Sequence, residues 1–155
     1  MTTTLATTTL ALNSDYFSTL GRNVGAIACY AILGVVLILI GFYAIDVSTP
    51  GKLTQLVQLG RPNASVVAAS GMVSMAFIVV LAIYSSGGKL SEGLISTAVY
   101  GLLGILAQAI GLRLLEMGTS IKIGPLLANE KLVSSTFVVA AGHLAIGLIV
   151  AVAIL

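Results

Sequence analysis

The sequence predicts an all-α membrane protein with four transmembrane helices, formed by a tandem duplication of a helical hairpin. One observation is composition: 58% of the 155 residues are hydrophobic, only 8% are charged, and the mean hydropathy is +1.13. A soluble domain of this size cannot bury so much apolar surface. The second observation is four long apolar runs, and the third is a match of the chain with itself at an offset of 70 residues.

Each apolar run is long enough to cross about 30 Å of hydrocarbon as a helix. The runs cover residues 24–45, 64–84, 94–115 and 133–155. Ahead of them, residues 1–21 form a threonine-rich tail without Lys or Arg. Because a secretory signal begins with positive charge, we expect this tail to be retained.

The internal match divides the rest of the chain into two repeats, residues 22–86 and 87–155. The equivalent residues at an offset of 70 are Tyr30 and Tyr100, Gly34 and Gly104, Gly41 and Gly111, Asp46 and Glu116, and Thr49 and Thr119. One inserted loop residue then aligns further positions, among them Gly71 with Gly142. Since each unit crosses the membrane twice, both copies enter from the same side, which predicts a parallel repeat with its pseudo-twofold axis along the membrane normal.

The distribution of positive residues predicts the orientation. Short cytoplasmic loops retain Lys and Arg, and five of the seven basic residues lie on one side: Lys52, Arg61, Arg113, Lys122 and Lys131. Arg22 and Lys89 lie on the other side. We therefore expect loops 46–63 and 116–132 in the cytoplasm and both termini outside.

The first of these loops predicts a short helix on the membrane surface. Thr49 is a candidate N-cap and Pro50 a candidate first helical residue. The residues expected to meet a peripheral partner are Lys52, Leu53, Leu56, Val57 and Arg61. The entry to the next helix, Asn63 and Ser65, is expected to cap that helix.

Several of these features resemble the YjfL-like family, bacterial inner-membrane proteins of unknown function built from two-transmembrane-helix repeats. They are the repeated hairpin, Asp46, Thr49 and Pro50, and the helix entry Gly60, Asn63 and Ala64. The resemblance covers about residues 24–155. It implies a small multi-pass protein of the bacterial cytoplasmic membrane, in the company of membrane-stress proteins and of peptide- or polyamine-modifying enzymes.

Polar residues inside the apolar runs mark a candidate intramembrane site. Ionisable groups are costly at this depth, yet His143, the only histidine, lies near the middle of the fourth run. Gln108 lies in the third run at a depth that differs by about 5 Å, so a hydrogen bond between their side chains, direct or through a water molecule, is expected. Arg113 and Glu116 are three residues apart and can pair at the inner end. Asp46 and Glu116, the repeated acids, are expected to close their loops onto the helix ends.

Small residues predict how the helices pack. In bilayers, glycines let helix backbones approach closely. The glycines assigned to helix contacts are Gly34, Gly41, Gly71, Gly104, Gly111, Gly142 and Gly147.

These features favour a structural or partner-docking membrane component, in envelope maintenance or membrane stress, that forms a homo-oligomer or binds another protein at its cytoplasmic loops. The alternative is a proton- or ion-coupled channel, transporter or pH-sensing transducer using His143 and Gln108, and a holin-like pore former is a third hypothesis. No catalytic motif predicts an enzyme. One cysteine and one histidine cannot form a zinc site, so no metal or cofactor is expected, and no basic aromatic surface predicts nucleic-acid binding.

Overall fold

The computed structural model describes residues 14–49, 52–87 and 89–155, and the regular structure in these ranges is helical. The elements are α1 Ser14–Ser48, α2 Leu53–Gln58, α3 Pro62–Ser85, α4 Leu90–Thr119, α5 Ile123–Ala128 and α6 Ser134–Ala153. The four long helices, α1, α3, α4 and α6, are each long and apolar enough to cross a membrane. The prediction of four transmembrane helices is confirmed.

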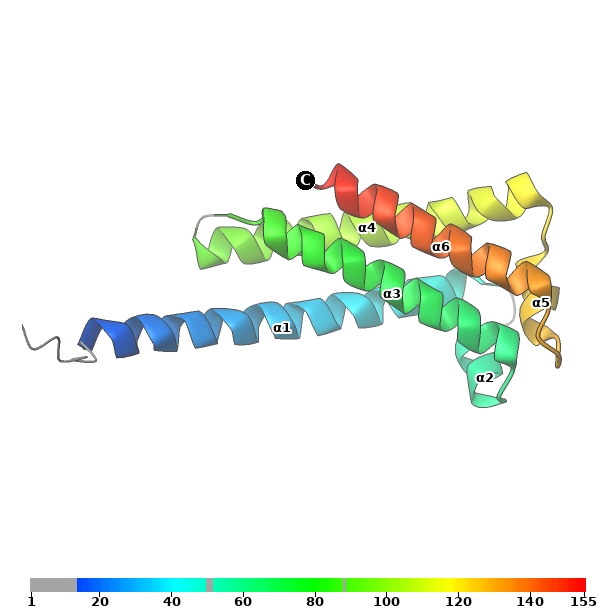
Figure 1. Cartoon of the computed structure of the whole chain (residues 1–155), viewed down its shortest axis with the longest axis horizontal. Coiled ribbons are helices and arrows are strands. Elements are labelled where there is room, and N and C mark those ends of the chain that lie inside the picture. The colour runs from blue at the N-terminus through cyan, green and yellow to red at the C-terminus, as the bar shows by residue number, and fades with distance from the viewer. Residues whose placement is uncertain (1–13, 50–51, 88) are drawn as a thin grey trace, which may run out of the picture.

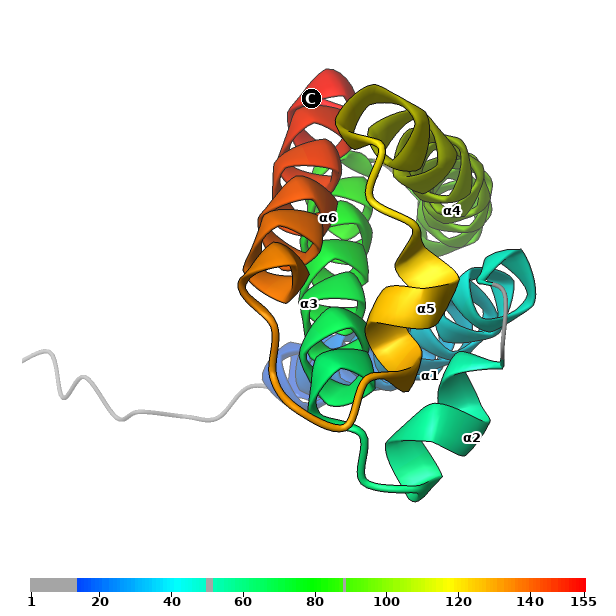
Figure 2. The same cartoon turned by 90° about the vertical axis from the view of Figure 1, so that its right-hand side faces the viewer.

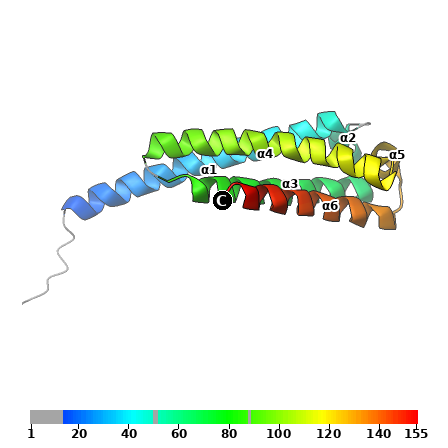
Figure 3. The same cartoon turned by 90° about the horizontal axis from the view of Figure 1, so that it is seen from above.

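The four long helices pack along a common direction, with α3 in contact with the other three (Figure 1). α1 and α4 run the same way, because Tyr30 lies against Gly93 and Leu37 lies against Gly101. α3 and α6 also run parallel to one another, and opposite to α1 and α4 (Figure 3). Consecutive long helices are therefore antiparallel, as expected when short connections join them.

The short helices α2 and α5 contact each other and cover one end of the bundle (Figure 2). We call this the α2/α5 end. Thr49 does not begin α2; its hydroxyl donates to the Ile45 carbonyl at 2.8 Å, and α2 starts at Leu53. Pro50 lies outside the described residues. A turn at Gly60, whose φ of +72° suits glycine, leads into α3, and Pro62 occupies the first turn of that helix.

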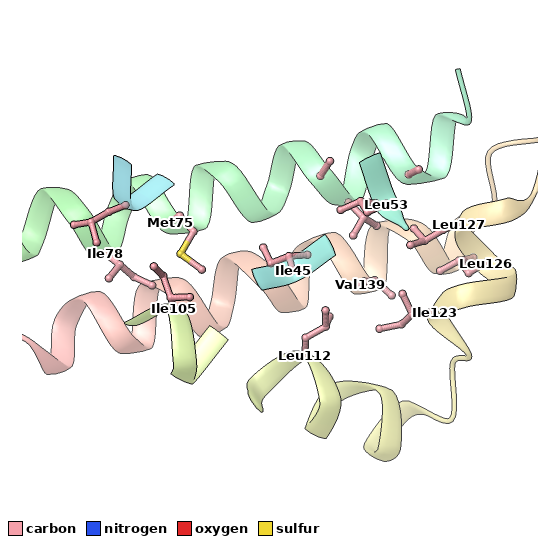
Figure 4. Close-up of a cluster of buried hydrophobic side chains, with 14 of the residues drawn as sticks. Ile45, Leu53, Met75, Ile78, Ile105, Leu112, Ile123, Leu126, Leu127 and Val139 are labelled. Atoms are coloured by element: carbon pink, nitrogen blue, oxygen red, sulfur yellow. The ribbon is translucent and has the colours of Figure 1, made fainter. Parts of the chain in front are cut away.

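The apolar core runs from the middle of the bundle to the α2/α5 end (Figure 4). Met75, Ile78 and Ile105 form its inner part, while Leu53 of α2 and Leu127 of α5 close the end. Both closing residues have no exposed surface. The short helices are thus part of the core rather than loose surface segments.

Helix α1 is longer than its apolar run predicts. It begins at Ser14, within the range assigned to the tail, and its 35 residues give a length of about 52 Å at 1.5 Å per residue. Its N-terminal part projects past the ends of α3 and α4 (Figures 1 and 3). Apolarity could not reveal this start, because Ser14 and Asp15 are polar residues that favour the beginning of a helix.

Candidate functional site

Four buried polar side chains meet between α3, α4 and α6. Ser70 and Ser74 come from α3, Gln108 from α4 and His143 from α6. Gln108 and His143 have no exposed surface at all. We call these four residues the polar cluster. Because unpaired polar groups are costly inside a membrane protein, the bonds of each member decide what the cluster can do.

Glycines bring α3 and α6 together at the polar cluster. A Cβ atom added to Gly147 would overlap the Ser74 hydroxyl and lie 3.1 Å from the Ser74 Cα. A Cβ atom on Gly71 would lie 3.5 Å from His143 Nδ1. The two backbones therefore touch almost directly, as small residues permit in membrane helices.

Gln108 joins all three helices through its amide nitrogen. Nε2 donates to Ser74 Oγ at 2.7 Å and to the His143 carbonyl at 3.1 Å. Ser74 Oγ donates to the same carbonyl at 2.8 Å. The sequence predicted a bond between the Gln108 and His143 side chains; the structure brings the two residues together, but Gln108 bonds the main chain of His143 instead.

The imidazole of His143 faces α3. Ser70 Oγ donates to the Val67 carbonyl at 2.8 Å, which uses its only hydrogen. The 3.4 Å contact between Ser70 Oγ and His143 Nδ1 is therefore a long hydrogen bond in which Nδ1–H donates. When the ring is neutral, this assignment leaves Nε2 as its acceptor nitrogen.

Two buried acceptors of the polar cluster have no hydrogen-bond partner within the described part of the chain. They are His143 Nε2 and Gln108 Oε1. An acceptor of this kind requires a donor, such as a water molecule or a proton, to be satisfied. This is the one feature of the cluster that packing alone does not explain.

Arg113 and Glu116 lie apart from the polar cluster, toward the α2/α5 end. Their side chains form the predicted pair, with Arg113 Nη1 3.5 Å from Glu116 Oε2. Glu116 Oε1 also accepts a hydrogen bond from the Ile123 backbone nitrogen at 3.1 Å. Glu116 therefore ties the start of α5 to the end of α4.

Asp46 does for α2 what Glu116 does for α5. Asp46 Oδ1 accepts from the Thr54 backbone nitrogen at 2.6 Å. The repeated threonines match as well: Thr49 donates to the carbonyl four residues before it at 2.8 Å, and Thr119 does the same at 2.7 Å. Both repeated acids thus bond the first turn of the short helix that follows.

The loop residues assigned to a partner are used mainly inside the protein. Leu53 is fully buried, and Leu56 and Val57 pack against the core. Arg61 pairs with Glu130 of the second loop at 2.8 Å, and Lys52 remains exposed. The apolar side of α2 therefore faces the bundle, where α2 and α5 together cover the end of the four long helices.

Asn63 carries a role that the sequence did not predict. Instead of capping its own helix, it lies at 0% exposure against the connection between α5 and α6. Its Nδ2 donates to the carbonyls of Asn129 (3.0 Å) and Lys131 (2.8 Å). Its Oδ1 accepts from the Val133 nitrogen (2.9 Å) and the Thr136 hydroxyl (2.6 Å). Ser65 bonds only the Arg61 carbonyl of its own turn.

The glycines assigned to helix contacts each lie against a side chain of another helix. Gly34 meets Val79, Gly41 meets Met75, Gly71 meets Ile45, Gly104 meets Ile78, Gly111 meets Ile146, Gly142 meets Leu115 and Gly147 meets Ser74. Gly21 and Gly25, in the N-terminal half of α1, have nothing within 4 Å of an added Cβ atom. This contrast separates the glycines used within the chain from those that are not.

The interactions of the predicted site residues described above are hydrogen bonds and ion pairs. These residues contain no cluster of three or more His, Cys, Asp or Glu side chains that could hold a metal ion. Gln108, His143 and Ser74 have no exposed surface, and Ser70 is 8% exposed. The polar cluster is accordingly a closely packed site within the described part of the chain.

Comparison with known proteins places the whole bundle in one family. The family described as Domain of Unknown Function (DUF350) matches residues 18–154. A UPF0719 transmembrane protein of Mycolicibacterium paratuberculosis is 36% identical over 133 residues, which cover 84% of this chain and 88% of the relative. UPF0719 transmembrane proteins of Mycobacterium bovis and Mycobacterium tuberculosis are each 41% identical over 81 residues, covering 52% of this chain and 53% of theirs. No solved structure matches the chain.

Proposed function

Because this chain belongs to the DUF350 family, whose relatives are transmembrane proteins, we propose that it is a structural membrane component that works by associating with further copies of itself. The observation that carries the proposal is in the N-terminal half of α1. Gly21 and Gly25 there are the two helical glycines of α1 that meet no side chain of the described chain. A membrane helix uses such positions for close contact with another helix.

The free glycines lie on the side of α1 that faces away from the bundle. At 100° per residue, Gly21 and Gly41 are about 200° apart, and Gly41 packs on Met75 inside the bundle. Gly21 and Gly25 are separated by one helical turn and a fraction, the spacing of a close helix dimer. A second copy offers the same glycines, so two α1 helices can approach symmetrically.

Cys29 provides a direct test of this association. It is exposed and lies one turn after Gly25, where it lines an open apolar groove between α1 and α4 together with Leu94 and Ile95. Oxidation of the protein in vesicles with copper phenanthroline is expected to give a disulfide-linked dimer. Gly25→Leu should lower the yield several-fold, because a large side chain separates the helices.

The matched control moves the cysteine around the helix. In a Cys29→Ser background, Ala31→Cys puts the thiol two residues on and about 200° away, at another exposed position. Its dimer yield should be several-fold lower than that of the wild type. Equal yields at the two positions, or no effect of Gly25→Leu, would exclude association through this face.

The proposal includes a tandem duplication of a two-helix unit, the repeat of the YjfL-like family. Its support is the order long helix, short helix, long helix, which occurs twice. The hydrogen bonds of Thr49 and Thr119 also match at the offset of 70 residues, and Asp46 and Glu116 each accept from the first turn of the following short helix, at donors 8 and 7 residues later. The copies have diverged in packing: His143 is fully buried, whereas its equivalent, Met72, is 42% exposed.

The proposed location is a bacterial cytoplasmic membrane, with the α2/α5 end in the cytoplasm and both termini outside. The support is the basic residues Lys52, Arg61, Lys122 and Lys131 in the two loops at that end. Envelope maintenance under membrane stress is the setting that the YjfL-like resemblance implies. In this setting a small bundle would organise lipids or proteins around an oligomer.

A second candidate function is proton or ion coupling at the polar cluster. It is favoured by the buried acceptors His143 Nε2 and Gln108 Oε1, since each needs a donor that the described chain does not supply. Histidine can bind and release a proton in the physiological range. Against it stands the apolar side chain of Ile78, which is fully buried one turn beyond Ser74 on α3.

Proton flux into vesicles separates the two functions. We expect the purified wild type in liposomes to conduct no more than empty liposomes, and His143→Met, which has the residue of the first repeat, to behave identically. Flux in the wild type that is lost in His143→Met, with both proteins eluting as folded species, would establish the coupling function instead. Met72→Leu, an exposed position at the equivalent place in α3, is the control.

A further inference from the structure

A polar cleft lies where α1 passes the turn between α3 and α4. It encloses about 510 Å³ and is lined by Arg22, Asn23, Tyr30 and Lys89, with Ala26 and Leu90. The Tyr30 hydroxyl is 3.3 Å from Ser86 Oγ and lies against Gly93. Tyr30 thereby joins α1 to the turn and forms a fixed wall of the cleft.

An apolar groove continues from this cleft along α1. It encloses about 720 Å³ and shares Asn23, Ala26 and Tyr30 with the cleft. It extends to Ile38, with Ile83 of α3 on its other side. The groove exists because α3 ends at Ser85 while α1 continues past it (Figure 3).

The groove is long enough to take an acyl chain of one bilayer leaflet. From Asn23 to Ile38 the helix rises about 22 Å, which exceeds the about 15 Å of hydrocarbon that one leaflet contributes. Arg22 and Lys89 lie just outside the apolar runs 24–45 and 94–115, which is the level of lipid headgroups. The charged cleft would therefore lie at the level of a phospholipid headgroup, and the apolar groove at the level of its acyl chains.

The charge of the cleft selects among lipids. Arg22 and Lys89 bring two positive charges, and Glu92, 4.0 Å from Lys89, offsets one of them. The remaining charge is positive, and it favours a headgroup with net negative charge over a zwitterionic one. We propose that the cleft and groove bind an anionic phospholipid, with its phosphate between Arg22 and Lys89 and an acyl chain along α1 as far as Ile38.

This site is independent of the proposed self-association. The groove lies on the side of α1 that continues toward Gly34 and the bundle, whereas Gly21 and Gly25 face the opposite way. Loss of dimer formation therefore leaves the lipid site intact, and loss of lipid binding leaves the dimer contact intact. An experiment that excludes self-association therefore does not exclude lipid binding, and the reverse also holds.

Native mass spectrometry of the full chain, released from detergent with added lipid, tests the proposal. Phosphatidylglycerol and phosphatidylcholine with identical acyl chains are the probes. We expect the wild type to retain phosphatidylglycerol at least about five-fold better, since one charge near a membrane surface is worth about that factor. Arg22→Gln with Lys89→Gln should remove this preference, while Lys122→Gln with Lys131→Gln, at the other end, should change it less than about two-fold.

Two further variants test the groove. Ala31→Trp and Ile38→Trp place an indole in the path of the acyl chain and should each reduce retention of both lipids, Ala31 being exposed and tolerant of a larger side chain. Glycerol phosphate, which has no chains, should not compete with phosphatidylglycerol. Equal retention of the two lipids by the wild type, or equal effects of the two charge pairs, would overturn the proposal. Unchanged retention in both tryptophan variants, competition by glycerol phosphate, or a second copy of the chain bound in place of lipid would also overturn it.

Discussion

Gly147→Ala is expected to lower the free energy of unfolding by about 2–4 kcal/mol, although alanine is the better helix former by about 1 kcal/mol. The added methyl group would overlap the Ser74 hydroxyl and lie 3.1 Å from the Ser74 Cα. Backbone atoms cannot turn aside as a flexible side chain can. The helices must separate, which costs about 1–3 kcal/mol for overpacking and a similar amount for strained buried hydrogen bonds.

The measurement is the apparent melting temperature of the detergent-solubilised protein. It is obtained by size-exclusion chromatography of samples heated to increasing temperatures. Gly118→Ala is the control, because a Cβ atom there meets nothing within 4 Å. It should change stability by no more than about 1 kcal/mol, in the favourable direction. The double variant Gly147→Ala with Ser74→Gly should recover part of the loss, since it removes the Ser74 Cβ and Oγ atoms that the alanine methyl group would overlap. Equal melting of Gly147→Ala and Gly118→Ala would show that α3 and α6 separate without cost.

The membrane spans could be predicted because they depend on a single physical quantity, the apolar length of a helix. The start of α1 could not be predicted in this way. Ser and Asp, the residue types at positions 14 and 15, are frequent at helix N-termini, and this preference is independent of hydropathy. The apolar run marks the part of α1 that needs a bilayer, whereas the helix itself continues beyond it.

The proximity of Gln108 and His143 could be predicted from the sequence, but the hydrogen bonds of the polar cluster could not. Depth and helical spacing brought Gln108 and His143 together correctly. They did not predict that Gln108 Nε2 bonds the main chain of His143, because this depends on how far α6 slides along α4. Ser74, which joins them, carried no signal in the sequence beyond being a small polar residue in an apolar run.

Asn63 illustrates a limit of local rules. A polar residue in the first turn of a helix is normally assigned to that helix as a cap. Asn63 instead satisfies the first turn of α6, whose N-terminal groups are 70 residues later in the sequence. No local pattern distinguishes a cap in its own helix from one supplied to a neighbouring helix; only the parallel packing of α3 and α6 creates the second case.

Asn63→Ala is accordingly expected to destabilise the protein by about 2–4 kcal/mol, an effect as large as that of Gly147→Ala. The variant leaves the carbonyls of Asn129 and Lys131 and the Val133 nitrogen without their partner. Each buried group left unpaired costs about 1–3 kcal/mol, and water at the end of the bundle relieves part of that sum. Asn63→Asp should also destabilise, because it keeps the acceptor oxygen but turns a negative charge toward two carbonyls.

Asn129→Ala is the matched control for the connection between α5 and α6. Its side chain is exposed and accepts one hydrogen bond from the Lys131 nitrogen at 3.2 Å, so its loss should cost no more than about 0.5 kcal/mol. Limited trypsin digestion at Lys131 supplies a local readout, and cleavage should become faster in Asn63→Ala before the whole protein unfolds. If both variants melt together and Lys131 stays protected, α5 and the Arg61–Glu130 pair hold this connection, and Asn63 only fills space.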